Sequence, residues 1–430
     1  MSALARYFKA IGKQVLGYDK VRSPLCEALE QEGMEIVYKD DANVVLKDVL
    51  NTTSTLCVFT PAIPKDSQIK SMFVKHGFTL YKRAEILGLI SQQKACLAVA
   101  GTHGKTTTST ILGHIFKEAN TNATSFLGGI SENYNSNLIL GGDEISIVEA
   151  DEYDRSFLQL SPNIACVTSM DADHLDIYGE ATELENSFID FSRKVSDIVI
   201  VKKGLLIEGL TYGIEEKADY NAENIRIENG FYVFDVQTPN EIVKNIKSNL
   251  PGKHNVLNTV AALAMANSYG ISLQVIAEAL LTFKGVKRRF SYQIKTENLV
   301  LIDDYAHHPA EITVAANTIN ELYPTKKKLG IFQPHLFSRT RDFVNEFAAS
   351  LALFDELILL DIYPARELPI EGVNSNWLLK KININKKQVS SKRNLIQNIL
   401  KSNAQVIAIL GAGDIGQMVE SIKKSLEIES

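Results

Sequence analysis

Residues 97–110, LAVAGTHGKTTTST, constrain the fold of this chain more than any other stretch. Leu97 to Ala100 is a short apolar run, typical of a buried strand, and the residues from Ser109 onward have the periodicity of an amphipathic helix. Between them lies a loop with two glycines, followed by Lys105 and Thr106. A strand, a glycine loop and a helix N-terminus together favour phosphate binding, because backbone N–H groups and the positive end of the helix face the anion.

The loop therefore predicts a nucleotide site, in which Lys105 reaches the terminal phosphates and the Thr106 hydroxyl binds Mg²⁺. Its spacing is shorter than the full GxxxxGK motif, since the first glycine would fall at Val99. Glycines after a strand are often only turn residues. The Lys-Thr pair at the helix start nevertheless favours ATP with Mg²⁺, and we expect the whole loop to take part: Gly101, Thr102, His103, Gly104, Lys105, Thr106 and Thr107.

Composition limits the class of protein. The chain has 430 residues, a formal net charge of −6 and 45% hydrophobic residues, which suits a soluble enzyme of two or three domains. This charge favours neither nucleic acid nor a membrane surface as partner, and the locally basic residues 380–393 suit a solvated face. The four cysteines are widely spaced and no apolar run approaches the length of a membrane span. We therefore expect a cytoplasmic protein without a zinc site.

Helix and strand patterns alternate along the chain and predict an α/β fold of three domains. Residues 1–12 form a helical pattern ahead of the first strand pattern, at 14–19. We expect an N-terminal, incomplete Rossmann-like domain over 1–92, a central P-loop ATPase-type parallel sheet over 93–290, and a C-terminal Rossmann-like domain over 291–430.

Acidic residues follow two strand patterns of the central domain. Glu149, Asp151, Glu152 and Asp154 end the run SIVEADEYD, and His174 closes Asp-Ala-Asp-His after the run IACVTSM. Ligands of open α/β sheets gather at the carboxyl ends of strands, so these side chains are well placed to hold magnesium against phosphates. The alternatives are a solvated acidic turn and a histidine with a structural hydrogen bond. Together, Glu149 and His174 suggest two metal positions.

Further polar groups lie beyond the central domain's first half. Asn255 and Asn258 are one helical turn apart and could face one neighbour, such as a base edge, although Asn255 alone would suit helix capping. Arg288 and Arg289 precede a strand, and their planar guanidinium groups suit a phosphate. In the third domain, charged residues end four strand patterns, and they include Asp303, Asp304, His307, His308, His335, Arg339 and Arg341.

Residues 411–416, GAGDIG, match the dinucleotide-binding motif GxGxxG. That motif also needs a second strand and an acidic residue about twenty positions later. The sequence has too few residues after Gly416 for either. We interpret this loop as a tight turn, not as an NAD site.

Eight segments, in this order, resemble the Mur ligase family: GTHGKTTT, EADEYD, DADHLDIYG, GKHNVLN, RRF, DDYAHHPAEI, FQPH with SRTRDF, and DIYPARE. The resemblance covers almost the whole chain. It implies a UDP-substrate-binding domain, an ATPase domain and a C-terminal amino-acid-binding or lid domain. The last four segments imply a ligase that joins L-alanine to UDP-N-acetylmuramate in peptidoglycan synthesis, with an acyl-phosphate intermediate and release of ADP and phosphate.

The resemblance also implies roles for single residues. Lys105 would act on the transferring phosphate, Thr106 and Glu149 would hold the first Mg²⁺, and Glu149 with His174 the second. Asn258 and Asn255 would contact adenine, and Arg289 would contact the phosphates. Asp304 would contact the ribose, and Arg339 would hold a substrate carboxylate.

The chain departs from the family at several positions. Leu336 stands where some relatives have arginine, and residues 186–189, Asn-Ser-Phe-Ile, hold no lysine where many relatives carry a carbamylated one. We expect water or another carboxylate to complete that second metal shell. His307 should line the site, in a role that the sequence leaves open.

Family members begin with a strand and a glycine loop ahead of the residues matching Met1 to Leu4. That loop binds the diphosphate of the UDP substrate. We expect these 430 residues to bind ATP but to bind the UDP sugar poorly, unless the native reading frame starts further upstream.

Three alternative functions remain open on the sequence: a peptide-recycling ligase of the same family, a non-ligating P-loop ATPase and a non-catalytic UDP-sugar sensor. The expected assembly is a monomer or weak homodimer.

Overall fold

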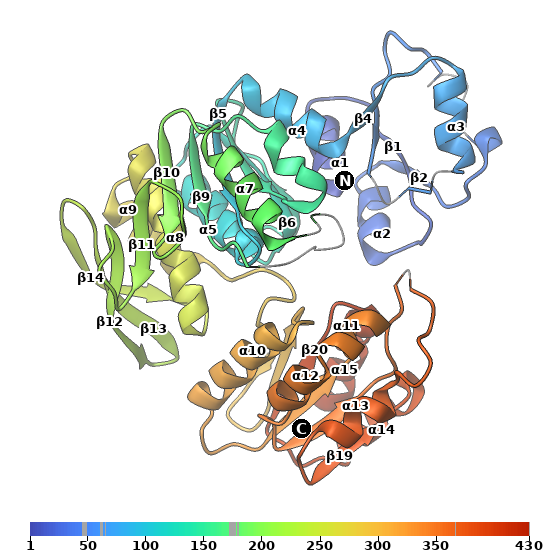
Figure 1. Ribbon diagram of the computed structural model, residues 1–430, viewed down its shortest axis with the longest axis vertical. Coiled ribbons are helices and arrows are strands. Elements are labelled where there is room, and N and C mark those ends of the chain that lie inside the picture. The colour runs from blue at the N-terminus through green and yellow to red at the C-terminus, as the bar shows by residue number, and fades with distance from the viewer. Residues whose placement is uncertain are drawn as a thin grey trace. The chain divides into compact units, whose positions relative to one another are not determined.

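The computed structural model describes residues 1–44, 50–60, 63–64, 66–171, 178, 180–365 and 367–429. Within them the chain forms two units, drawn in Figure 1. Unit 1 comprises Met1–Ile225, Phe234–Lys247 and Leu257–Phe283. Unit 2 comprises Arg226–Val233, Ser248–Val256 and Lys284–Ser430.

The first part of unit 1 contains short parallel strand pairs between helices. Strand β1 pairs with β2 and β3 pairs with β4, so two small sheets form instead of one continuous sheet. A further strand ahead of them stays a prediction. The elements are α1 (Ser2–Ala10), β1 (Leu16–Tyr18), α2 (Pro24–Gln31), β2 (Glu35–Val37), η1 (Ala42–Val44), β3 (Cys57–Phe59), α3 (Gln68–Lys75), β4 (Leu80–Lys82) and α4 (Arg83–Gln92).

Helix α1 forms where the sequence predicted a helix, and it packs on the next sheet. Ala3 and Leu4 are buried in one core with Phe126 and Leu138. The Arg6 guanidinium donates to Asn137 over 2.7 Å and also pairs with Glu32. The chain start is therefore fixed to the central sheet by apolar and polar contacts.

The central sheet has the strand order β14-β13-β12-β11-β10-β9-β5-β8-β6-β7 among the described residues. Its elements are β5 (Ala95–Ala100), α5 (Lys105–Glu118), β6 (Ala123–Ser131), β7 (Ser136–Ile139), β8 (Ile145–Ala150), η3 (Tyr153–Gln159), β9 (Ile164–Val167), α7 (Ala181–Ser192), β10 (Ile198–Lys202), β11 (Leu210–Ile214), β12 (Tyr220–Glu228), β13 (Phe231–Gln237), β14 (Ile242–Ser248), α8 (Lys253–Tyr269) and α9 (Leu273–Thr282).

Strand β5 lies between β8 and β9, parallel to both, and its side chains from Cys96 to Ala100 are fully buried. This confirms the buried strand that the apolar run predicted. The sheet is not wholly parallel, however, because β7 pairs antiparallel with β6. The sequence analysis also left β12 to β14 unassigned. Asn229 and Gly230 join β12 to β13 with φ values of +52° and +81°, and an Asn-Gly pair of this kind is a strong hairpin signal.

The sheet of unit 2 has the order β15-β16-β20-β17-β18-β19, with β15 antiparallel to β16 and the other pairs parallel. Its elements are β15 (Ser291–Lys295), β16 (Val300–Asp304), α10 (Pro309–Leu322), β17 (Lys328–Phe332), α11 (Phe337–Asp342), α12 (Val344–Leu351), β18 (Glu356–Leu359), α13 (Ser375–Lys381), β19 (Lys386–Val389), α14 (Lys392–Leu400), β20 (Val406–Leu410), η4 (Asp414–Met418) and α15 (Val419–Glu429).

Alternate residues of this sheet enter different cores. Val300 and Ile302 of β16 lie in one hydrophobic cluster, and Leu301 lies in the other. Since successive side chains of a strand point to opposite faces, both faces of the sheet are covered. This confirms the α/β class that the sequence predicted. Over the described residues, every helix is too short or too polar to cross a membrane.

Candidate active site at the β5–α5 loop

Two glycines give the loop after β5 its shape. Gly101 has φ +137°, and a Cβ there would lie 2.1 Å from Thr168 Oγ1. Gly104 has φ +84°, and a Cβ there would lie 2.6 Å from Asn258 Oδ1. Both positions therefore need glycine, for backbone conformation and for space. Helix α5 then begins at Lys105 without a side-chain cap, so its first N–H groups remain suited to an anion.

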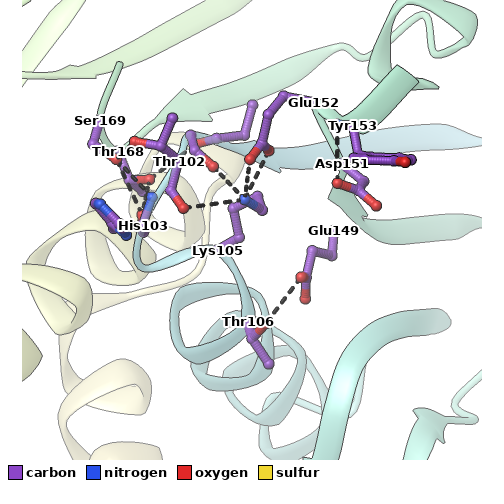
Figure 2. Close-up of polar contacts among 12 residues, drawn as sticks. Thr102, His103, Lys105, Thr106, Glu149, Asp151, Glu152, Tyr153, Thr168 and Ser169 are labelled. Carbon is purple, nitrogen blue, oxygen red and sulfur yellow. Dashed lines mark hydrogen bonds and ion pairs between the residues drawn. The ribbon is translucent and has the colours of Figure 1, made fainter. Parts of the chain in front are cut away.

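The end of β9 holds the loop in place (Figure 2). Thr168 Oγ1 donates to the carbonyl of His103 over 2.5 Å, and Ser169 Oγ accepts from the His103 N–H over 2.8 Å. The Thr102 N–H donates to the Ser169 carbonyl over 3.2 Å. Neither Thr168 nor Ser169, which follow β9 (Ile164–Val167), was predicted from the sequence. The N–H groups of Thr102 and His103 thus have protein acceptors, and phosphate contacts by these two residues stay a prediction.

Lys105 is held by a buried carboxylate. Its Nζ lies 2.7 Å from Glu152 Oε2 and 2.5 Å from the carbonyl oxygen of Gly101. Glu152 is 1% exposed, and burial raises the pKa of its carboxyl group while the charge of Lys105 opposes this rise. Figure 2 shows the ammonium group of Lys105 between Glu152 and the loop.

Thr106 and Glu149 face each other, as their expected metal roles require. Thr106 Oγ1 donates to Glu149 Oε1 over 2.9 Å, and the Gly128 N–H donates to Glu149 Oε2 over 2.8 Å. The contact exists because β5 and β8 are neighbours with Val99 opposite Glu149. A Cβ at Gly128 would lie 2.3 Å from both carboxylate oxygens of Glu149.

The other acidic residues after β8 do not share this site, which corrects the expectation of one acidic cluster. Glu152 turns to Lys105, and Asp154 pairs with Lys82 over 2.7 Å. Asp151 accepts from the Tyr153 N–H. Two consecutive left-handed residues, Asp154 and Arg155, redirect the chain at the end of this acidic run.

The second predicted metal position falls on His174, which lies outside the described residues. Among the residues that the structure does describe, no group of three or more histidine, cysteine, aspartate or glutamate side chains is arranged to hold a metal ion. Thr106 with Glu149 is a smaller set, of the kind that suits Mg²⁺ because this ion keeps several waters.

Asn255 and Asn258 both lie in the first turns of α8, and a common neighbour for them stays a prediction. The Asn255 amide donates to the Pro251 carbonyl over 2.7 Å at the start of α8, which supports the structural interpretation of this residue. Asn258 Oδ1 accepts from Thr108 and lies next to Gly104. Asn258 is therefore beside the phosphate loop, as is Thr107, which is buried in α5.

In unit 2, Asp304 at the end of β16 fixes the preceding chain segment. Its two carboxylate oxygens accept the N–H groups of Phe290 and Ala306, each over 2.7 Å. Burial raises the pKa of Asp304 to about 6, against the charge of Arg289. The Arg289 guanidinium lies 5.3 Å from the centre of the Tyr305 ring.

The GAGDIG loop receives an arginine of the same unit. The Arg288 guanidinium donates to the Gly411 carbonyl and pairs with Asp303 over 3.4 Å. A Cβ at Gly416 would lie 2.5 Å from this guanidinium, so the glycine makes room for it. The loop is thus packed against an internal cation, and the interpretation that it is not an NAD site stays a prediction.

His307, His335 and Arg339 gather at the ends of β16 and β17. The rings of His307 and His335 lie 5.9 Å apart, and burial lowers the pKa of both, to about 4 for His335. In the described part of the chain, His335 Nδ1 and Arg339 Nη1 are buried without a hydrogen-bond partner. Leu336 between them has φ +74°, which is unusual for a bulky residue and marks local strain.

Comparison with known proteins places the chain in a family. It is 56% identical to a UDP-N-acetylmuramate–L-alanine ligase of Christiangramia forsetii, over 99% of this chain and 95% of that protein. A protein of the same name from Flavobacterium psychrophilum is 55% identical over 99% of this chain and 96% of its own length. Three family models match in succession: the Mur ligase family catalytic domain at residues 1–95, the Mur ligase middle domain at 99–266 and the Mur ligase glutamate ligase domain at 288–413.

The chain belongs to the Mur ligase family.

A solved structure agrees with this assignment. The UDP-N-acetylmuramate–alanine ligase MurC of Thermotoga maritima matches with a TM-score of 0.86 and 27% identity, over 100% of this chain and 97% of that one. The phosphate loop, Glu149 and Asn258 of this Mur ligase lie in the middle-domain match. Arg289, Asp304 and Arg339 lie in the glutamate ligase domain match.

Proposed function

We propose that this Mur ligase joins L-alanine to UDP-N-acetylmuramate at the expense of ATP, in peptidoglycan precursor synthesis. The observation that supports this most directly is the 56% identity, over 99% of the chain, to a ligase of that name. In the reaction, the γ-phosphate of ATP passes to the substrate carboxylate. The amine of L-alanine attacks the resulting acyl phosphate, and ADP and phosphate leave.

The loop at residues 101–107 suits the phosphates of ATP. Its two glycines have positive φ values that shape the loop, and α5 begins without a side-chain cap, so its first N–H groups suit an anion. Lys105 would stabilise the negative charge on the transferring phosphoryl group, where a fixed cation acts most strongly because little water screens it. Asn258, next to the loop, would contact the adenine base. Asn255, which is close to it in the sequence, would contribute to the same contact.

The donor set fits Mg²⁺. Thr106 and Glu149 offer one hydroxyl and one carboxylate, which are hard oxygen ligands within hydrogen-bond distance of each other. Bound there, Mg²⁺ would neutralise charge between the two anionic substrates. Gly128 would hold the Glu149 carboxylate in orientation through its N–H group. His174 would hold the second ion.

Three residues of unit 2 would bind substrates. Arg339 would hold a substrate carboxylate, and its buried Nη1, which has no partner among the described residues, supports this role. Arg289 would bind phosphate. Asp304 would accept a ribose hydroxyl, since a carboxylate has about four acceptor sites and two are used by backbone N–H groups.

We further propose a cytoplasmic location and a monomer or weak homodimer. Among the described residues all four cysteines are buried and free, which suits a reducing compartment. Analytical ultracentrifugation of the purified chain tests the assembly.

The decisive experiment measures phosphate release with ATP, Mg²⁺ and UDP-N-acetylmuramate across a panel of amino acids and one tripeptide. We expect release that depends on both the sugar and L-alanine, with the amide product found by mass spectrometry. Release with the tripeptide alone would indicate a recycling ligase, and release without the sugar a plain ATPase. No release with any acceptor, even at sugar concentrations high enough to saturate a weak site, would contradict the proposal.

A further inference from the structure

The ammonium group of Lys105 has a full set of protein acceptors. The carbonyl oxygen of Gly101 lies 2.5 Å from Nζ, and the Glu152 carboxylate lies 2.7 and 2.9 Å away through its two oxygens. The Thr102 carbonyl is the most distant, at 3.4 Å. Since a lysine ammonium has three N–H donors, a phosphate oxygen can bind only when one acceptor is exchanged.

The Thr102 carbonyl is the acceptor that costs least to exchange. Its contact is near the outer limit for a hydrogen bond, and contacts with charged partners are stronger than those with neutral carbonyls. Glu152 would be the most costly to release, because an unpaired buried carboxylate is strongly unfavourable. The two short contacts thus leave one N–H of Lys105 for the nucleotide.

The backbone around Glu152 is fixed independently of its side chain. Tyr178 Oη donates to the Glu152 carbonyl over 2.6 Å, and the Arg155 N–H donates to the same oxygen over 2.9 Å. Asp154 and Arg155 have φ values of +55° and +54°. Non-glycine residues keep such conformations only where the surrounding structure enforces them. The contacts at the Glu152 carbonyl thus hold the backbone from which its side chain reaches Lys105.

We propose that Glu152 is a positioning residue for the phosphoryl transfer. It keeps the Lys105 ammonium in one orientation while phosphate replaces the Thr102 carbonyl. This inference rests on the proposed function, because it takes the lysine to act on ATP. For this role the reach of the side chain matters more than its charge, since an uncharged oxygen 2.9 Å from Nζ would still be a closer acceptor than the Thr102 carbonyl at 3.4 Å.

Two conservative variants separate the effect of the length of the Glu152 side chain from the effect of its charge. Glu152→Gln keeps the length of the side chain and one oxygen acceptor but removes the charge. Glu152→Asp keeps the charge but withdraws the oxygens by one methylene. Glu144→Gln is the matched control, because Glu144 is an exposed carboxylate and has no part in the proposed machinery. Ligation rates and KM values for ATP and for the sugar are measured for all three.

We expect kcat to fall about tenfold or more in Glu152→Asp and less than about threefold in Glu152→Gln, since small misplacements of a catalytic group cost this much. KM for the sugar should stay unchanged in both. The reverse order, equal losses or no loss in either variant would overturn the proposal.

A binding measurement separates this inference from the proposed function. With a non-hydrolysable ATP analogue, the Kd should rise about threefold or more in Glu152→Asp and less than about twofold in Glu152→Gln, since one weakened hydrogen bond is worth this much. If the wild-type chain binds the analogue but does not ligate, the proposed function fails, and the order of the two Kd values still decides the role of Glu152.

Discussion

Lys105 is the side chain whose loss should affect turnover most directly. Replacing it with alanine removes the cation from the transferring phosphoryl group, so Lys105→Ala should lower kcat by about a hundredfold or more. Lys194→Ala, at an exposed lysine on the same unit, is the control and should keep wild-type turnover. The steady-state ligation assay measures both. Near-normal turnover of Lys105→Ala would remove the loop from the catalytic mechanism.

Glu149 should set the magnesium requirement. Glu149→Gln keeps the shape of the side chain but weakens a hard anionic ligand, so the Mg²⁺ concentration for half-maximal activity should rise by about tenfold or more. Gly128→Ala should act in the same direction, because its Cβ would meet the carboxylate at 2.3 Å. Glu144→Gln, at an exposed carboxylate, is the control. If the magnesium titration is unchanged in both variants, Glu149 is not a magnesium ligand.

His174 gives a separate magnesium prediction. As a ligand of the second ion, its change to alanine should raise the Mg²⁺ requirement more than the KM for L-alanine. Activity is measured as Mg²⁺ and L-alanine are titrated in turn, with all other components at saturating levels. Equal shifts would return His174 to a structural role.

At the scale of elements, the β5–α5 loop depends on β9. Thr168 Oγ1 lies within hydrogen-bond distance of the carbonyls of Ala100 and His103. Thr168→Val keeps the shape and removes the hydroxyl, so the His103 carbonyl loses its short hydrogen bond, while the Ala100 carbonyl keeps the Thr168 N–H as a donor. The unfolding free energy should fall by about 1–3 kcal/mol, and ATP should bind more weakly.

Urea unfolding and nucleotide titration test this prediction. Thr182→Val, at an exposed threonine in α7, is the control. If Thr168→Val binds ATP as the wild type does, the shape of the loop does not depend on its contact with β9.

At the scale of the whole molecule, buried histidines should make the protein sensitive to acid. Burial lowers the pKa of His254 to about 4, with a contribution from Arg289. Burial also lowers the pKa of His335 to about 4, with contributions from His307 and Arg339. Between about pH 6.5 and pH 4 the unfolded chain binds protons at these positions and the folded chain does not. Stability should therefore fall as the pH falls through this range.

The measurement is the melting temperature between pH 7 and pH 4.5. His254→Gln should reduce the loss of stability on acidification, whereas His76→Gln, at an exposed histidine of α3's C-terminus, should leave it unchanged. Identical pH profiles for wild type and His254→Gln would contradict the assignment.

The elements on either side of the phosphate loop and the local chemistry of the loop follow from the amino-acid sequence alone. A buried apolar run, two glycines and a Lys-Thr pair at a helix start identify β5, its loop and α5, because strand and helix periodicities and the needs of left-handed glycines are local properties. The pairing of Thr106 with Glu149 was implied by the family resemblance, and it agrees with the position of Thr106 after β5 and of Glu149 near the end of β8, where ligands gather.

Contacts between side chains far apart in the chain depend on the tertiary structure. The order of the strands places β9 beside β5, so that Thr168 and Ser169 support the loop. The carboxylate that contacts Lys105 is that of Glu152 and not that of Glu149. It also places Arg288 against Gly416. These contacts join residues far apart in the chain, and they arise from the packing of whole elements around buried cores. Periodicity within one segment contains no information on its neighbours in space, and for this reason the sequence predicted the elements but not these partners.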